Sequence, residues 1–424
     1  MRLLHFSDIH IGMENYGKLD PETGLSTRLL DFLKTFDFIV ETAISEKVDA
    51  VVFSGDAYKT RDPNPTQQRG FGERIKKIAK SGIPVILVIG NHDTPNATGK
   101  ANTLDIYSAL EIDNVWVSRK PELLNIPTGA GNLQIVTLPW LHKDDYKSVG
   151  DKLKNLYDKI KSDSPAIFLS HVEVEGASYG SEKGMAIAND VTVPLPLLQD
   201  KRLNYVALGH IHKHQVLGKD PLVIYAGSPH RIDFGEEKED KGVILIDINP
   251  NVILPTKSGV FHEAKRNEGS PTNVGSSNKL RDSSPTAQND RYTTSYKFID
   301  TNCRQFLSIK LDLKSTDSNS TQTILDEIGK HDVTEKIVRL TINIPGDLEG
   351  EVEMDKIKKA LAGAHYIAGI SRNVERKERV KIEGADEVER LTPIEALGKY
   401  FQAKQISPER QKELEKYAAL LLEN

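Results

Sequence analysis

The chain has 424 residues, of which 38% are hydrophobic and 28% charged, and its formal net charge is −5 at pH 7. These values are typical of a soluble globular protein with two or three domains. They argue against a protein coated in positive charge, although a local basic groove on an otherwise acidic surface remains compatible with nucleic-acid binding.

A single cysteine, Cys303, cannot form an internal disulfide. The fold therefore does not depend on an oxidising compartment, and we expect a cytoplasmic protein. The opening MRLLHFSDIH lacks the apolar core of a signal peptide, and no later segment approaches the roughly 20 apolar residues that span a bilayer. We expect neither export nor a membrane partner.

Five short β-rich runs end in a small residue and polar side chains. Runs of this length are typical of strands buried on both faces, in a sheet layered between helices, and helical patterns separate them at 27–47, 67–81 and 146–162. Because binding groups collect beyond the carboxyl ends of such strands, we expect the five motifs to converge on one crevice. In chain order the motifs are Asp8-Ile9-His10, Gly55-Asp56, Gly90-Asn91-His92-Asp93, His171 and Gly209-His210-Ile211-His212.

Each of these polar residues has an ordinary explanation when it stands alone. Asp8 or Asp56 can cap a helix, and a lone histidine at a strand end is more often structural than a ligand. Together, however, two aspartates, an asparagine and at least four histidines would be costly to bury without a cation. Mixed imidazole and carboxylate ligands fit manganese, iron or zinc better than calcium, and so many ligands suit two ions that share a bridging carboxylate. Two such ions activate water and clamp a phosphoryl group, so the pattern predicts phosphoester hydrolysis.

The order DxH, GD, GNHD, H and GHxH resembles the calcineurin-like metallophosphoesterase superfamily. More narrowly, YVALGHIHKHQ (Tyr205–Gln215) followed by YAGSPHRIDFGE (Tyr225–Glu236) is similar to SbcD-type DNA repair nucleases, the bacterial counterparts of the meiotic recombination nuclease. The similarity covers residues 1–250 well and the remainder more loosely. It implies an α/β fold: a layered metallophosphoesterase β-sandwich flanked by helices, with a small α/β capping domain and a C-terminal helical hairpin.

The resemblance also implies a role for each motif residue. It implies that one ion is held by Asp8, His10 and His212, that the second is held by Asn91, His171 and His210, and that Asp56 bridges the two.

Two further motif residues, and Lys59 close to one motif, have expected roles outside the metal ligands. His92 would lie beside the scissile phosphate, where it stabilises charge or protonates the leaving oxygen. Asp93 would orient a ligand or cap a loop rather than bind metal. Lys59 stands where many relatives carry a histidine, three residues after the GD aspartate. A lysine can hold a phosphate as a point charge, so we treat Lys59 as a substrate contact.

Four other histidines are expected to lie outside the ligand set. His5 falls within the first predicted strand and should be a packed or hydrogen-bonded core residue, whereas His142 should lie in a loop. His214 and His230 are close enough in sequence to the motifs to approach the site, but no pattern marks either as a ligand.

The chain changes character after Asn249. Residues 255–292 are rich in Ser, Asn, Pro, Thr and Gly and predict a disordered surface loop, with a DNA-contacting arm as the alternative because basic residues such as Lys265 and Arg281 are present. After Arg304 the pattern predicts a compact β-α-β-α-β domain, which in relatives caps the nuclease and places DNA over the metals. The predicted organisation is 1–254 nuclease domain, 255–292 loop, 293–303 returning strand and link, 304–389 capping domain and 390–424 helical partner-binding segment.

The C-terminal segment predicts two short amphipathic helices. Thr392-Pro393-Ile394-Glu395 has capping-box spacing, and Ser407-Pro408 opens a second helix in the same manner. That helix carries an apolar stripe of Leu414, Tyr417, Ala418 and Leu421. Two such helices cannot bury both apolar faces alone. They dock on the chain's own body or, as the resemblance implies and as we favour, bind the coiled-coil base of an SbcC-type ABC ATPase.

The motifs and the resemblance together predict a DNA nuclease with two Mn²⁺ ions, for which Mg²⁺ or another divalent ion could substitute. The resemblance implies a 3′ to 5′ exonuclease on double-stranded ends and an endonuclease on hairpins or single strands, acting as a homodimer whose access to duplex DNA is gated by the ATPase. The residues alone support only metal-assisted phosphoester hydrolysis.

Two alternative classes stay open at this point. A phosphomonoesterase or cyclic nucleotide phosphodiesterase could use the same metal core, but it would need a closed pocket for a small molecule. A non-catalytic binding protein that keeps the fold would be expected to lack ligands, and none is missing here.

Overall fold

The protein is described by a computed structural model that covers residues 1–95, 99–143, 145–180, 191–251, 287–288, 291–317, 319–346, 348–375, 392–404 and 406–422. Most of the loop predicted at 255–292 lies outside the described residues. The chain forms two compact units, the first made of residues 1–308, 333–339 and 363–368, the second of residues 309–332, 340–362 and 369–424. The domain boundaries predicted from the sequence stay predictions.

The first unit contains a seven-stranded sheet in the order β14-β15-β13-β1-β2-β3-β4. The four strands from β1 to β4 run parallel, whereas β13, β15 and β14 extend the sheet in antiparallel fashion. The strands are β1 (Arg2–Phe6), β2 (Ala50–Phe53), β3 (Val85–Val88), β4 (Val115–Ser118), β13 (Gly242–Pro250), β14 (Ala287–Gln288) and β15 (Tyr292–Asp300).

A second sheet of six strands has the order β11-β12-β10-β7-β6-β5. Its central strands β6, β7, β10 and β12 are parallel, and the two edge strands are antiparallel to their neighbours. The strands are β5 (Glu122–Thr128), β6 (Gly131–Leu138), β7 (Ala166–His171), β10 (Tyr205–Gly209), β11 (Gln215–Lys219) and β12 (Leu222–Tyr225). A small two-stranded sheet is made of β8 (Glu173–Val174) and β9 (Thr192–Val193).

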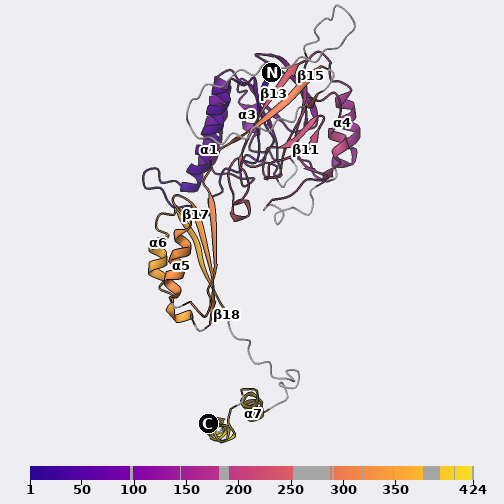
Figure 1. Cartoon of the computed structure of the whole chain (residues 1–424). Helices are drawn as coiled ribbons and strands as arrows, with labels where there is room; N and C mark the ends of the chain where they lie inside the picture. The colour runs from indigo at the N-terminus through magenta and orange to yellow at the C-terminus, as the bar shows by residue number, and fades with distance from the viewer. Residues whose placement is uncertain are drawn as a thin grey trace, which may run out of the picture. The chain divides into compact units, whose positions relative to one another are not determined.

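The two sheets pack face to face with helices on the outside, and Figure 1 shows α1 and α4 on opposite sides of them. One apolar core joins the two inner faces through residues such as Val52 and Ile167, and two further cores join the outer faces to the helices. The helices are α1 (Thr27–Ser45), α2 (Pro65–Lys80) and α3 (Asp105–Ala109) against the first sheet, and α4 (Val149–Tyr157) against the second. The layered sandwich is confirmed.

The structure confirms two of the predicted helices and differs from the sequence expectation in a third helix and in the number of sheets. The helices predicted at 27–47 and 67–81 are confirmed as α1 and α2. The helix predicted at 146–162 is shorter at both ends, because a 3₁₀ helix, η1 (Asp145–Ser148), replaces its first turn and α4 ends at Tyr157. The expectation of one sheet between helices is wrong, because the motif-bearing strands divide between two sheets. An apolar strand is buried on both faces whether its second face meets a helix or another sheet, so the pattern cannot separate the two arrangements.

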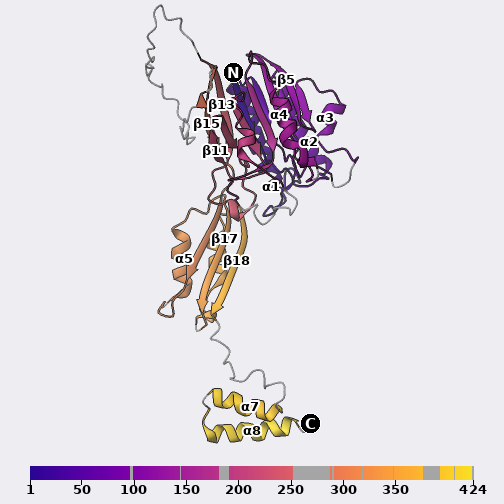
Figure 2. The ribbon, with the colours of Figure 1, turned by 90° about the vertical axis from the view of Figure 1, so that its right-hand side faces the viewer.

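After Arg304 the element order predicted from the sequence is confirmed as β16 (Phe306–Asp312), α5 (Ser320–Gly329), β17 (Ile337–Pro345), α6 (Met354–Ala360) and β18 (Tyr366–Glu375). The strands form a sheet in the order β16-β17-β18, and Figure 1 shows α5 and α6 along it. The last two helices, α7 (Pro393–Ala403) and α8 (Pro408–Leu422), lie side by side in Figure 2. The capping box at the start of α7 is formed by Thr392 and Glu395, as predicted. Among the described residues, no helix combines the length and the apolar character that crossing a membrane requires.

Candidate metal centre

The five motifs lie where strands of both sheets end. Turns after β1, β2 and β3 of the first sheet carry the first three motifs, β7 of the second sheet ends with His171, and the turn after β10 carries His210 and His212. Backbone hydrogen bonds join the turns: the Asp8 N–H donates to the Gly55 carbonyl (2.9 Å), and the His210 N–H donates to the Asp8 carboxylate (3.1 Å). The strand ends of two sheets therefore meet at one place.

The turns have unusual backbone geometry. Asp8, His10, Asp56 and His210 have φ angles of 52°, 46°, 61° and 97°, in a region that residues other than glycine seldom adopt. Such geometry persists only where the surroundings impose it, and it is common at functional sites.

Two motif glycines are required by close backbone approach. A Cβ atom at Gly90 would lie 2.1 Å from Asp56 Oδ1, and one at Gly209 would lie 2.1 Å from the Ser54 carbonyl oxygen. Both separations are far shorter than a van der Waals contact, so the glycines in GNHD and GHxH allow the neighbouring turns to come together.

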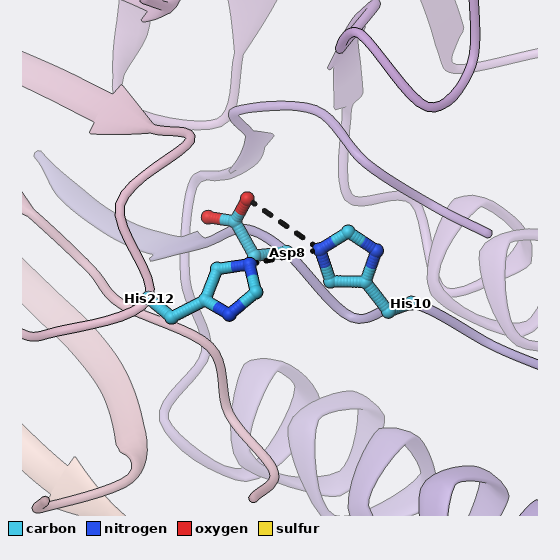
Figure 3. A group of neighbouring side chains, drawn as sticks. All are labelled: Asp8, His10 and His212. Carbon is cyan, nitrogen blue, oxygen red and sulfur yellow. Dashed lines mark hydrogen bonds and ion pairs between the residues drawn. The ribbon is translucent and has the colours of Figure 1, made fainter. Parts of the chain in front are cut away.

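Asp8, His10 and His212 form the first cluster of potential ligands (Figure 3). The two Nε2 atoms of His10 and His212 lie 3.0 Å apart, and His10 Nε2 lies 4.0 Å from Asp8 Oδ1. His212 Nδ1 is 2.8 Å from the carboxylate of Glu236, which is an acceptor, so the proton sits on Nδ1 and the Nε2 lone pair faces His10.

The second cluster has the same arrangement on the opposite side of Asp56. His171 Nδ1 donates to the Ser54 carbonyl (2.7 Å), so Nε2, which lies 2.9 Å from Asn91 Oδ1, is the nitrogen that can bind a cation or carry a second proton in its place. His210 Nδ1 lies 3.3 Å from the same amide oxygen. Asp56 Oδ2 is 3.4 Å from His171 Nε2 and 3.6 Å from His10 Nε2, so one carboxylate oxygen lies between the two clusters.

This donor set fits two divalent cations. Lone pairs of imidazole nitrogens, carboxylates and an amide oxygen converge in a buried space, where they repel one another unless protons or cations lie between them. Neutral imidazole with carboxylate and amide oxygen suits first-row transition ions, and Asp56 is placed to contact both. The structure brings the seven predicted ligands together, and their role as ligands stays a prediction.

The pKa values in the cluster have opposite shifts with clear causes. Burial lowers the pKa of His210 to about 3 and that of His10 well below its usual value, which keeps both imidazoles in the neutral form that metals bind. Burial alone would raise the pKa of Asp56, but His171 and the other imidazoles hold it well below its usual value. In return Asp56 outweighs the effect of burial on His171 and raises its pKa to about 9. The proton thus held beside Asp56 occupies a position that a cation would take.

His92 is oriented by two contacts that the sequence did not indicate. Its backbone N–H donates to Asp56 Oδ1 (2.9 Å), and its ring Nδ1 donates to the backbone carbonyl of Lys59 (2.6 Å). The ring also lies edge-on to His10, with centroids 4.9 Å apart. Lys59 was predicted from its side chain, yet it holds the His92 ring through its carbonyl, which any residue type would supply.

Asp93 acts on backbone groups rather than on the clusters. Its carboxylate accepts hydrogen bonds from the N–H groups of Asp56 (2.9 Å), Ala57 (3.0 Å) and Gly90 (3.0 Å), and its side chain is buried. It therefore ties the turn after β2 to the turn after β3.

The remaining histidines make other contacts. His5 lies between Tyr205 Oη and Ser54 Oγ, each 2.8 Å away, so the predicted core role is confirmed. His230 binds the buried Arg28, and neither His214 nor His142 belongs to a potential ligand group among the described residues. Sequence reasoning missed Glu236, which accepts a hydrogen bond from His212; its signal in the sequence was its place at the end of YAGSPHRIDFGE.

Comparisons with known proteins found a matching family profile and several similar proteins. A family profile described as calcineurin-like phosphoesterase matches residues 1–214. The chain is similar to the SbcD component of nuclease SbcCD from Bacillus subtilis, with 25% identity over 59% of this chain and 67% of that protein, and to its Escherichia coli K12 counterpart, with 26% identity over 58% and 64%. It is 27% identical to the DNA double-strand break repair protein Mre11 of Sulfurisphaera tokodaii over 59% of this chain and 60% of that protein. The matched segments span about two thirds or less of these relatives.

Proposed function

The chain belongs to the calcineurin-like phosphoesterase family, and we propose that it is a two-metal DNA nuclease that processes DNA ends or double-strand breaks. The observation that carries the proposal is the convergence of two buried ligand clusters on the single carboxylate of Asp56. The similarity to the SbcD component of nuclease SbcCD and to Mre11 supports DNA as the substrate.

The residues of the chain divide the work in this proposal. Asp8, His10 and His212 hold one ion, Asn91, His171 and His210 hold the other, and Asp56 bridges them. Two divalent ions at such a centre supply charge stabilisation for the phosphoryl oxygens and activate water at neutral pH.

His92 serves as the proton donor or charge stabiliser. The Nδ1–H of His92 donates to the Lys59 carbonyl, so Nε2 is the nitrogen that can contact the substrate. The hydrogen bond from the His92 backbone N–H to Asp56 fixes the position of the residue. A ring held in this way can approach the leaving oxygen without losing entropy during the reaction.

The finer parts of the proposal concern metal, polarity and partners. The ions are Mn²⁺, the activity is a 3′ to 5′ exonuclease on duplex ends and an endonuclease on hairpins or single strands, and the protein works as a homodimer with an SbcC-type ATPase. The helical hairpin of α7 and α8 is the proposed contact for the ATPase: Tyr400 and Tyr417 are 44% and 61% exposed there. Exposed aromatic side chains of this kind are common anchors at interfaces.

The test is cleavage of end-labelled linear duplex and hairpin DNA by metal-stripped protein resupplied with Mn²⁺ or Mg²⁺. We expect Mn²⁺-dependent cutting, and we expect His92→Asn to lose it while still binding Mn²⁺. Tyr205→Phe is the matched control, because it removes a buried polar contact of His5 outside the ligand clusters and leaves the packing volume almost unchanged.

The alternatives have distinct outcomes in the same assay. Turnover of a small phosphodiester without any DNA cleavage, alone or with the ATPase, would replace the nuclease by a small-molecule phosphodiesterase. Normal DNA cleavage by His92→Asn would remove His92 from the mechanism.

A further inference from the structure

His212 is held at both of its ends by one buried group of charges. Its ring Nδ1 donates to Glu236 Oε1 (2.8 Å), and its backbone carbonyl accepts a hydrogen bond from Lys241 Nζ (3.1 Å). The side chains of Glu236 and Lys241 are fully buried and pair with each other at 2.9 Å. In the other cluster, His171 instead donates to a backbone carbonyl, so a carboxylate behind the ring distinguishes His212 from its counterpart.

Residues of the turns around His212 place Glu236 and Lys241 against it. Glu236 ends the 3₁₀ helix η4 (Phe234–Glu236), and its Oε2 also accepts the Ile232 N–H at 2.9 Å. Ser228 donates its N–H to the His212 carbonyl (3.0 Å) and accepts from Lys241 Nζ through its hydroxyl (2.7 Å). A Cβ atom at Gly227 would lie 2.7 Å from that carbonyl oxygen, so only glycine lets this turn approach.

The charge arrangement is not what stability alone would select. A buried ion pair is costly to desolvate, and apolar residues of similar volume often stabilise a core equally well. Here Lys241 contacts two carboxylates, those of Glu236 and Glu239, each at 2.9 Å. Glu236 is thus held by the Lys241 ammonium while its carboxylate lies directly behind a ring that faces a proposed cation.

We propose that Glu236 and Lys241 are positioning residues that set the tautomer and orientation of His212 and thereby the affinity of one metal site, the one that contains Asp8 and His10. This inference rests on the proposed two-metal centre. It adds that Glu236 and Lys241 affect the affinity for the first ion and leave unchanged the affinity for the ion held by Asn91, His171 and His210. A carboxylate behind a metal-binding imidazole fixes the nitrogen that carries the proton and makes the other a better donor.

Glu236→Gln is the diagnostic substitution. A glutamine oxygen can still accept from His212 Nδ1, but its NH₂ group would then face the Lys241 ammonium and the Ile232 N–H, which are donors. Calorimetric titration of the metal-free protein with Mn²⁺ should show the affinity of one site lowered by about 10- to 100-fold and the affinity of the other unchanged. The ¹⁵N NMR signals of His212 should change from a single Nδ1-protonated tautomer to a mixture.

A double variant keeps the test valid if Glu236→Gln does not fold. Glu236→Gln with Lys241→Met removes both charges together, so no buried ammonium is left beside a neutral amide. The same selective loss of Mn²⁺ affinity is expected in this variant. Asp247→Asn is the control, because it removes a partly exposed carboxylate paired with Arg2, and it should leave both affinities unchanged.

Two backgrounds identify the affected site. His171→Gln removes a proposed ligand of the second ion, and adding Glu236→Gln to it should lower the Mn²⁺ affinity of the first site, which remains. His10→Gln removes a proposed ligand of the first ion, and adding Glu236→Gln to it should leave the Mn²⁺ affinity of the second site unchanged.

Equal weakening of both sites, or wild-type affinity in a folded Glu236 variant, would overturn the proposal. Because the titration uses no DNA, a protein that binds two Mn²⁺ but cuts no DNA, alone or with the ATPase, would refute the nuclease assignment and still report on Glu236.

Discussion

Replacement of Asp93 by alanine should loosen the metal centre without removing any proposed ligand. The Asp93 carboxylate is the acceptor for three backbone N–H groups, two in the turn that carries Asp56 and one in the turn that carries Asn91. All of them are buried, and Asp93 itself is 1% exposed. The substitution therefore leaves three donors without their partner in a place that water reaches poorly.

The expected loss of stability follows from this count of donors. A buried N–H that loses its acceptor costs about 1–3 kcal/mol. Burial and the nearby Asp56 raise the pKa of Asp93 to about 6, so removing this carboxylate offsets part of that loss, and Asp93→Ala should lower the free energy of unfolding by about 2–5 kcal/mol. Asp93→Asn should cost less, about 1–3 kcal/mol, because the amide oxygen can replace the Oδ2 atom that accepts from Asp56 and Gly90. Only the Ala57 N–H would then face an NH₂ group.

Urea unfolding of the metal-free protein measures the effect. Both tryptophans, Trp116 and Trp140, lie in the first unit, so their fluorescence reports on that unit alone. Asp247→Ala, which removes a partly exposed partner of Arg2, is the control and should cost at most about 1 kcal/mol. If Asp93→Ala lost no more stability than the control, or if asparagine were as harmful as alanine, the Asp93 carboxylate would not hold these turns together.

Three further variants test other parts of the structure. Gly90→Ala should abolish Mn²⁺ binding measured by calorimetry, because its Cβ would lie 2.1 Å from Asp56 Oδ1; intact binding would show that the turn has room to move. Burial beside Arg28 lowers the pKa of His230 well below its usual value, so the unfolded chain takes up a proton below about pH 6.5 that the folded chain does not, and stability falls with falling pH. Between pH 7.5 and 5, the free energy of unfolding measured with urea should therefore fall by about 2 kcal/mol less in His230→Gln than in wild type. Equal falls in the two proteins would show that His230 does not cause this pH dependence. Lys59→Ala should keep Mn²⁺ affinity, because the carbonyl that holds the His92 ring remains, and loss of affinity would assign the lysine side chain a role in the centre.

Much of the candidate metal centre could be predicted because each of its motifs lies within a few consecutive residues. Each motif consists of an apolar strand, a small residue and one or two donor side chains within a few positions, and parallel strands bring their ends to one edge. That reasoning identified Asp8, Asp56 and the GHxH histidines, and the order of motifs identified the family, which the profile match confirms. The helices α1 and α2 were predictable for the same reason, since the cap and the apolar period lie within the segment itself.

The tertiary structure decided what depends on contacts between distant segments. Burial on both faces is the same beside a helix or beside a sheet, so the apolar runs could not show that β7 and β10 belong to a different sheet from β1. The carbonyl of Lys59 and the backbone partners of Asp93 carry no side-chain signature at all. Glu236 lies 24 positions after His212, and only the folding of the intervening turn brings its carboxylate to the ring. The sequence by itself thus determined which donor side chains stand at the strand ends of the candidate centre, because each motif is local, whereas their protons and orientations follow from packing that joins two sheets.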